Sequence, residues 1–238
     1  MEIDYLRQLP LLNPANFKKS VAIIGAGATG SYVALALAQM GIKNISVYDF
    51  DNVEEHNLPN QCFGIEHIGM SKVDALNDVI KKKCGFNIQV YNEKVVAQTL
   101  RAGYIFILTD TMSSRKEIFN NCIKGRAFNT ELVIETRMDI DNGRVYAFNP
   151  NISAQVKEWE DTLYSDEEST ASMCRASFSI VPTVMVLAGL AVWRLLHHYD
   201  VNYGENLTEK RGKLPRFSEE VIFQLGPEQF LERNFKTL

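Results

Sequence analysis

SVAIIGAGATG, residues 20–30, joins a short β-branched apolar run directly to three closely spaced glycines. The apolar run is typical of a strand that is buried on both faces. Gly25, Gly27 and Gly30 form a G-x-G-x-x-G pattern. The first glycine of this pattern permits a tight turn, the second leaves room for a phosphate, and the third lets the following helix pack closely.

A helix is predicted directly after these glycines, with Gly41 just past its end. The free N–H groups and positive dipole at the start of such a helix bind anions. The next apolar run, 44–48, predicts a second strand that ends at Asp49 and completes a βαβ unit. An acidic residue about 20 positions beyond the glycines can accept hydrogen bonds from ribose hydroxyls. These features predict a nucleotide site that suits NAD, FAD and ATP alike.

The alternation of strand and helix patterns continues along the chain. Helices are predicted over 71–84, 113–123 and 179–197, and strands over 87–91, 103–108, 131–135, 144–148 and 220–225. A hairpin turn with positive φ is predicted at Asp141-Asn142-Gly143. The sequence therefore predicts an α/β fold, a doubly wound Rossmann-like and mostly parallel sheet with antiparallel C-terminal strands. Residues 149–173 show no periodicity, which predicts a long mobile loop over 151–173.

The length of 238 residues allows one large domain, or one domain with a small appendage. A formal net charge of −4 excludes the basic footprint of a nucleic-acid-binding domain. The four cysteines form no C-x-x-C pair, so we expect no structural zinc and a reducing, cytoplasmic setting. The most apolar run, 179–193, is shorter than the roughly 18 to 20 residues of a membrane span. We therefore expect a buried helix there and no membrane partner.

Five blocks carry a family resemblance: YLRQ at 5–8, DFDNVEEHNLPNQ at 49–61, GMSK at 69–72, TDTMSSR at 109–115 and CRASFSIVP at 174–182. In the same order they resemble the Y-x-R-Q, D-x-D-x-V-x-x-x-N-L-x-R-Q, G-x-x-K, T-D-N-x-x-x-R and C-R-x-x-G-V-x-x-P motifs of the ThiF/MoeB/HesA adenylyltransferases, relatives of the ubiquitin-activating enzymes. The resemblance implies an adenylation domain over 1–199 with a crossover loop at 151–173. A C-terminal extension over 200–238 would pack on the same domain.

The resemblance implies an activity as well. Members of this family use ATP and Mg²⁺ to adenylate the C-terminal carboxylate of a small carrier protein, which releases pyrophosphate. We therefore expect an adenylyltransferase that acts on a ubiquitin-like protein, a sulfur-carrier protein or a peptide C-terminus. This chemistry requires positive charge and metal near the phosphates.

By the same resemblance, Lys72 would contact the phosphates, Asp110 would hold Mg²⁺ or position the phosphates, and Arg115 would add positive charge. Read from the residues alone, Lys72 could be a solvated helix residue and Asp110 a helix cap.

Asp51, Asn57 and Gln61 match polar family positions near the nucleotide, although they could also cap a turn or tie down a loop. Asn60 stands where the family has an arginine, and an amide carries no charge. This departure keeps open a second function, that of a catalytically weak or inactive scaffold subunit. An NAD-dependent oxidoreductase is a third alternative, which the glycines and Asp49 alone would allow.

Two further residues have roles that depend on the resemblance. Arg7 matches a family arginine that reaches the γ-phosphate of a neighbouring subunit, which implies a homodimer. Cys174 matches a position where some members bond covalently to their carrier protein, whereas others keep this cysteine without a catalytic need for it.

Overall fold

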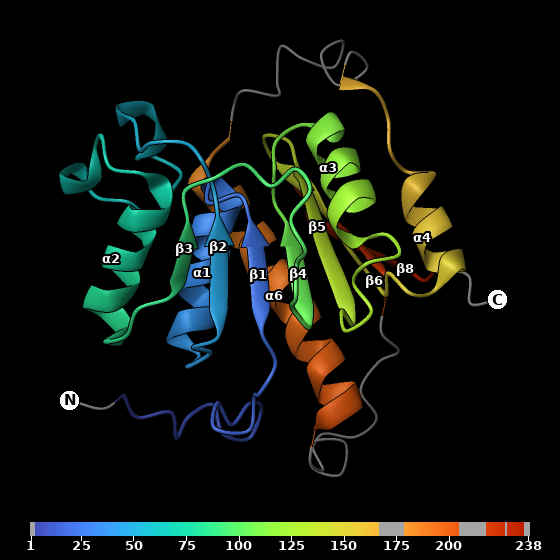
Figure 1. The fold of residues 1–238 in the computed structure, drawn as a ribbon, viewed down its shortest axis with the longest axis horizontal. Helices are drawn as coiled ribbons and strands as arrows, with labels where there is room; N and C mark the ends of the chain where they lie inside the picture. Colours follow the sequence, from blue (N-terminus) through green and yellow to red (C-terminus); the bar gives the residue numbers. More distant parts are fainter. Residues whose placement is uncertain (1–2, 167–178, 205–217, 227, 236–238) are drawn as a thin grey trace.

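Eight strands form one mixed sheet in the order β3-β2-β1-β4-β5-β6-β7-β8 (Figure 1). The structure is a computed structural model and describes residues 3–166, 179–204, 218–226 and 228–235. The parallel strands are β1 (Val21–Ile24), β2 (Ile45–Tyr48), β3 (Gln89–Tyr91), β4 (Tyr104–Ile107) and β5 (Leu132–Met138). The antiparallel strands are β6 (Asn142–Phe148), β7 (Glu220–Leu225) and β8 (Glu228–Arg233). The predicted fold class is confirmed.

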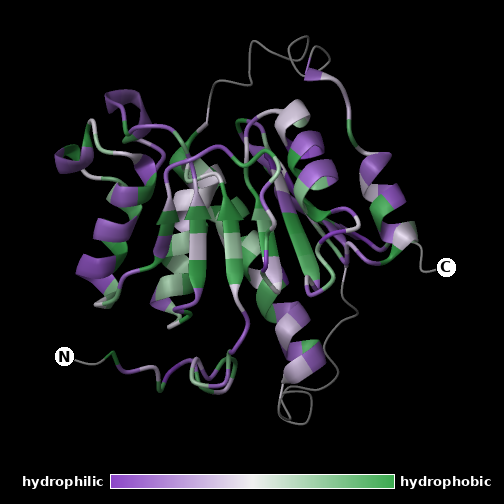
Figure 2. Ribbon diagram, viewed as in Figure 1, coloured by the Kyte–Doolittle hydropathy of each residue, from purple (hydrophilic) through white to green (hydrophobic). Residues whose placement is uncertain are grey.

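Helices cover both faces of the sheet. One face carries α1 (Ala28–Gln39), α2 (Lys72–Cys84) and α6 (Val181–Tyr203), and the other carries α3 (Met112–Ile118), the π-helical turn Phe119–Ile123 and α4 (Ser153–Glu160). Two short 3-10 helices, Glu55–Asn57 and Ile65–His67, lie between β2 and α2. Figure 2 shows the hydrophobic residues concentrated in the central strands and the hydrophilic ones on the outer helix faces. Two apolar cores result, one on each side of the sheet.

Helix α6 contains the most apolar run of the chain. It extends beyond the predicted end, to Tyr203, and by length and composition alone it could cross a membrane. Half of its most apolar stretch is buried inside the protein, where α6 packs against α1 and β5. Buried positions such as Leu187, Ala191 and Leu195 recur every four residues and place one face of α6 in the core.

The prediction of one long mobile loop over 151–173 is wrong for residues 153–160, which form α4. Trp159 of α4 is fully buried and packs against Phe119 and Phe148, with ring centroids 4.6 and 5.0 Å away. Only Val156 and Trp159 of α4 are large buried apolar residues, so the sequence showed no helical period there. The packing of Trp159 against these two rings holds α4 on the sheet.

The hairpin between β5 and β6 is confirmed, but its glycine has a different role from the one predicted. Gly143 lies inside β6, opposite Met138, and is not among the positive-φ glycines. A Cβ at this position would come within 2.7 Å of the Phe223 ring on β7. Glycine is required here because a neighbouring aromatic ring approaches closely, and the turn itself lies before it.

The sequence did not predict strand β8. All six of its residues are exposed, and β7 is its only neighbour in the described sheet. An exposed edge strand lacks the apolar alternation by which strands are recognised. Together β7 and β8 place part of the extension 200–238 on the same sheet as the rest of the chain.

Candidate nucleotide site

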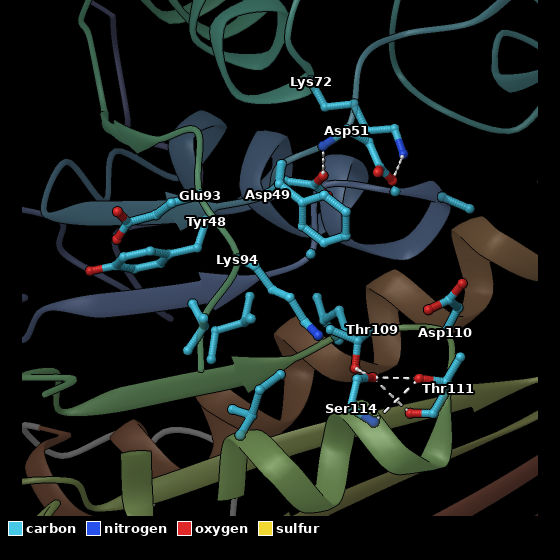
Figure 3. Close-up of a pocket in the computed structure, with 18 of the residues that line it drawn as sticks. Tyr48, Asp49, Asp51, Lys72, Glu93, Lys94, Thr109, Asp110, Thr111 and Ser114 are labelled. Atoms are coloured by element: carbon cyan, nitrogen blue, oxygen red, sulfur yellow. Dashed lines mark hydrogen bonds and ion pairs between the residues drawn. The ribbon is translucent and has the colours of Figure 1, made fainter. Parts of the chain in front are cut away.

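A cavity of about 510 Å³ lies at the carboxyl edge of the central parallel strands. This is the edge at which open α/β sheets bind ligands. Its lining comes from the ends of β1, β2 and β4, the starts of α1 and α2, helix α3, and the segments that follow β2 and β3. The lining residues are Ile24, Gly25, Gly27, Ala28, Tyr48, Asp49, Phe50, Asp51, Gln61, Lys72, Glu93, Lys94, Val95, Leu108, Thr109, Asp110, Thr111, Ser114 and Ile118. Figure 3 shows most of these side chains around the same space.

The glycine loop forms one wall of this cavity. Gly25 has φ +99°, and a Cβ there would lie 2.7 Å from the Leu108 carbonyl oxygen. A Cβ at Gly30 would overlap the Gly25 carbonyl oxygen, so this glycine serves the contact between helix and loop. Gly27 differs, because a Cβ there would meet no atom within 4 Å. No side chain caps the start of α1 at Gly27, which leaves its first N–H groups available to an anion.

Asp49 ties the glycine loop to the end of β2. Its carboxylate is buried and accepts hydrogen bonds from the backbone N–H groups of Ala26 at 2.6 Å and Asp51 at 2.9 Å. Burial raises the pKa of Asp49, and these two amides together with Lys72 oppose the increase. The carboxylate therefore shapes the loop, and its predicted bond to a ribose remains a prediction.

Lys72 is the first residue of α2, and it is buried. Its Nζ lies 2.7 Å from the Asp51 carboxylate, and both side chains line the cavity (Figure 3). Ser71 caps the helix by accepting a hydrogen bond from the Asp74 N–H, which fixes where α2 begins. The structure thus brings together two predicted residues from separate blocks as an ion pair at the cavity wall.

The three amides of the second block have different surroundings. Gln61 lines the cavity, and its buried Oε1 has no hydrogen-bond donor among the described residues. Asn57 is not among the lining residues and accepts a hydrogen bond from the Glu54 N–H at 3.0 Å. Asn60 donates to the Ser179 hydroxyl and does not line the cavity. Of these side chains, only Gln61 is placed by the structure to meet a ligand in the cavity.

Asp110 follows β4 at the opposite wall. Its carboxylate is exposed and makes no hydrogen bond or ion pair with another described residue. Thr111 caps α3 by accepting a hydrogen bond from the Ser114 N–H, and the Ser114 hydroxyl donates to Thr109 at 2.8 Å. Figure 3 shows this hydroxyl network beside Asp110. Asp110 is therefore available to a ligand, while its neighbours hold the turn that presents it.

Arg115 is not among the residues that line the cavity, and its catalytic role stays a prediction. Its Nε lies 2.9 Å from the Glu135 carboxylate, and its other nitrogens donate to the carbonyl oxygens of Thr136 and Asp110. Glu135 is fully buried and also pairs with Arg137 at 3.0 Å. A buried carboxylate requires a counter-charge. Arg115 therefore turns inward and supports the Asp110 backbone from behind.

The two remaining predicted residues lie elsewhere. Arg7 is exposed in the N-terminal segment, whose neighbouring Gln8 donates to the Met40 carbonyl at the far end of α1. Cys174 lies outside the described residues, as do residues 167–173 of the predicted crossover loop. In the described chain, neither Arg7 nor any cysteine lines the cavity.

The sequence analysis missed Lys94. This residue follows β3 and lines the cavity, and Figure 3 shows its amino group directed toward Thr109. Its Nζ also lies 3.6 Å from Glu117. The signal that could have found it is its position, because residues just after a parallel strand reach the ligand edge.

Gly27 provides a test that separates ligand binding from folding. We expect Gly27→Val to fold but to melt a few degrees lower without ligand. The new side chain meets open space, but the backbone at φ −75° and ψ −149° lies outside the regions that a β-branched residue prefers. The valine would fill the space before the helix N-terminus and abolish stabilisation by ATP. Thermal unfolding with and without ATP–Mg²⁺ measures both effects. Gly189→Val, at an exposed glycine with open space and ordinary φ outside the cavity, is the control and should keep the full shift with ATP.

Comparisons with known proteins agree on one family. The model of the ThiF family matches residues 13–220. Ubiquitin-like modifier-activating enzyme 5 of Caenorhabditis elegans is 36% identical over 76 residues, which are 32% of this chain and 18% of that protein. The enzyme of the same name from Arabidopsis thaliana is 43% identical over 56 residues, which are 24% of this chain and 13% of that protein. Both alignments thus span less than a fifth of the relative's length.

Solved structures share the fold at low sequence identity. Escherichia coli MccB, crystallised with AMPCPP and MccA, has a TM-score of 0.65 and 16% identity, over 98% of this chain and 67% of that one. PaaA has a TM-score of 0.67 and 18% identity, over 97% of this chain and 75% of that one. The family match covers most of the chain and coincides with the strand order and the glycine loop described above. This chain belongs to the ThiF family.

Proposed function

We propose that this protein uses ATP to adenylate the C-terminal carboxylate of a ubiquitin-like protein, a sulfur-carrier protein or a peptide. The observation that carries the proposal is the cavity itself, which has an uncapped helix N-terminus on one wall and the free Asp110 carboxylate on the other. Relatives named as ubiquitin-like modifier-activating enzymes, and a structural neighbour crystallised with AMPCPP and a partner named MccA, support both the reaction and the kind of acceptor.

The residues that line the cavity fit a nucleoside triphosphate. Open space before Gly27 leaves room for a phosphate against the N–H groups of α1. Lys72 and Lys94 supply positive charge from two sides of the cavity. The unpartnered Gln61 Oε1 offers an acceptor to a ligand hydroxyl or amine. These groups would bind and orient the triphosphate. Positioning and electrostatic stabilisation are the main contributions that a protein makes to this reaction.

The Mg²⁺ that we propose would be held by Asp110. No group of three His, Cys, Asp or Glu side chains is placed to bind a metal within the described part of the chain. Mg²⁺ is commonly bound through one or two carboxylates together with substrate phosphates and water. One free carboxylate at the cavity wall fits this pattern. When bound, the metal would neutralise charge on the phosphates, and Asp110 would set its position.

Arg7 supports a homodimeric active unit. Gln8 anchors the N-terminal segment at the C-terminal end of α1, whereas the cavity lies at its N-terminal end. The helix has 12 residues, so the two ends are about 18 Å apart. An arginine at this distance would reach a nucleotide only in a second copy of the chain. We propose a homodimer in the cytoplasm, with Arg7 completing the partner's site.

A scaffold subunit is the second candidate function. Asn60 favours it, because the amide donates to Ser179 and brings no positive charge to the cavity. The free Asp110 and the Lys72–Asp51 pair oppose it, because a scaffold would not need them. An NAD-dependent oxidoreductase is less favoured, since the family match covers residues 13–220 and the blocks beyond the glycine loop belong to that family.

Thermal unfolding with ATP–Mg²⁺, NAD and FAD tests the proposed nucleotide. A ligand at about 100 times its dissociation constant stabilises the folded state by about 2.7 kcal/mol. We expect ATP–Mg²⁺ to raise the melting temperature by several degrees and NAD and FAD to leave it unchanged. A shift with NAD alone would contradict the proposal. Binding of ATP without pyrophosphate exchange, for any carrier protein or peptide tested, would favour the scaffold.

A further inference from the structure

A second cavity, of about 500 Å³, lies on the antiparallel part of the sheet. We call it the arginine cavity, because Arg137, Arg144 and Arg233 all line it. Directly paired residues of neighbouring strands project from the same face of a sheet. Arg137 of β5 pairs with Arg144 of β6, and Glu220 of β7 pairs with Arg233 of β8. The fold therefore gathers three guanidiniums from three separate strands.

More guanidiniums than carboxylates line this cavity. Arg144 and Arg233 both pair with the buried Glu220, at 3.4 and 2.6 Å, and both are about half exposed. Arg137 shares Glu135 with Arg115. Asp139 also lines the cavity, and its carboxylate accepts a hydrogen bond from the Ile140 N–H. Three guanidiniums and one carboxylate thus line the cavity itself, and the two half-exposed guanidiniums share the single buried carboxylate of Glu220.

Tyr146 provides an independent indication of a ligand. It lines the cavity and is fully buried, yet its hydroxyl makes no hydrogen bond of good geometry with a described residue. The Arg137 guanidinium stacks 4.4 Å from the centre of its ring, and Arg144 lies beside the hydroxyl. A guanidinium can only donate, so the hydroxyl has no acceptor for its own proton among the described residues, and an unmade hydrogen bond of a buried group is costly. A ligand oxygen in the cavity would accept the hydrogen bond that this hydroxyl can donate.

The position of the arginine cavity relates it to the nucleotide cavity. Strands β4 and β5 are parallel with Ile107 opposite Glu135, so Arg137 lies level with the chain that leads to Asp110. The segment 162–166 connects the two places. Thr162 lines the arginine cavity and accepts from Arg137, whereas Asp166 accepts a 2.6 Å hydrogen bond from the Met112 N–H at the start of α3. If the C-terminus of a peptide lay beside Asp110, the residues before it could extend along the same edge of the sheet to the arginine cavity.

We propose that the arginine cavity binds an acidic side chain of the acceptor, upstream of the carboxylate that is adenylated. This inference rests on the proposed function for the identity of the acceptor. The planar guanidinium of Arg144 suits a carboxylate, and the Tyr146 hydroxyl supplies a further donor. A volume of about 500 Å³ exceeds the size of a single small anion and admits a whole glutamate side chain with its neighbours.

Fluorescence anisotropy with a labelled, C-terminally amidated tetraglutamate peptide tests this site without ATP. We expect the wild-type protein to bind it and to show no binding of tetraglutamine. Arg144→Gln should weaken binding about tenfold, the usual effect of losing a charge-assisted hydrogen bond. Arg233 would still pair with Glu220 in this variant, so the buried carboxylate keeps a partner. Arg126→Gln, at an exposed arginine outside both cavities, is the matched control and should bind as the wild type does.

Tyr146→Phe provides a second variant, which removes only the hydroxyl and should weaken tetraglutamate binding several-fold. Equal affinity for tetraglutamate and tetraglutamine, or unchanged binding in both Arg144→Gln and Tyr146→Phe, would overturn the proposal. Asp110→Asn separates this inference from the proposed function, because the amidated peptide needs neither nucleotide nor metal. Loss of the magnesium dependence of ATP binding in that variant, with tetraglutamate binding intact, supports two distinct sites.

Discussion

Asp110→Asn is expected to lower the rate of ATP–pyrophosphate exchange by about 10²- to 10³-fold, the range seen when one preorganised electrostatic contact to a transition state is removed. Asparagine keeps the size of the side chain but lacks the charge that would hold Mg²⁺. The carboxylate has no partner among the described residues, so its loss breaks no internal contact. Stability without nucleotide should therefore remain at the wild-type value. The exchange assay would use a synthetic peptide that ends in Gly-Gly with a free carboxylate.

Calorimetric titration makes the same prediction testable without an acceptor. The wild-type protein should bind ATP more tightly with Mg²⁺ than with EDTA, and Asp110→Asn should remove this difference. Asp161→Asn, at an exposed acid outside the cavity lining, is the matched control. If Asp110→Asn kept the full magnesium dependence, the metal would be held elsewhere and the assignment of Asp110 would be wrong.

Glu135→Gln is expected to destabilise the fold by about 3 to 5 kcal/mol, the cost of leaving a buried charge without its partner. The Glu135 carboxylate is fully buried and contacts Arg115, Arg137 and the indole N–H of Trp159. An amide of the same size would leave both guanidiniums without a counter-charge. In a chain of this length the melting temperature should fall on the order of 10 °C. Circular dichroism during heating would measure the change.

The surface pair between Lys124 and Glu160 provides the control. Its N···O distance of 2.6 Å is as short as those of the buried pairs, but both side chains are partly exposed to water. Exposed pairs contribute about 0 to 1 kcal/mol, so Glu160→Gln should melt within a few degrees of the wild type. Similar melting temperatures for the two variants would show that Arg115 and Arg137 do not depend on Glu135.

Because Arg115 also donates to the Asp110 carbonyl, Glu135→Gln should weaken ATP binding as well.

Local sequence patterns predicted the half of the molecule that forms the nucleotide cavity. The buried strand, the glycine loop and the helix that follows are contiguous in sequence, and their geometry depends on neighbours a few residues away. Asp110 was predictable for the same reason, since it lies three residues beyond the end of a fully buried strand, at the carboxyl edge. The parallel order of the strands followed from the βα alternation, which permits few topologies.

Arg115 shows where the sequence was insufficient. Its family match predicted a catalytic residue, but its direction is set by Glu135, which lies 20 positions further along the chain on a neighbouring strand. The same holds for Trp159, whose burial against Phe119 and Phe148 turns an irregular stretch into α4. Local sequence patterns do not predict which distant carboxylate or aromatic ring a side chain contacts in the folded protein.

The sequence by itself determined the fold class, the family and the strand ends at which the nucleotide cavity forms, because these follow from periodicity and from motifs of contiguous residues. The tertiary structure alone decided which of the predicted side chains face that cavity, and it alone brought Arg137, Arg144 and Arg233 together from three strands. The physical reason is that a buried or shared charge is oriented by the partner that offsets its desolvation. This oppositely charged partner comes from a distant part of the sequence, and the pairing of the strands places it next to the charge.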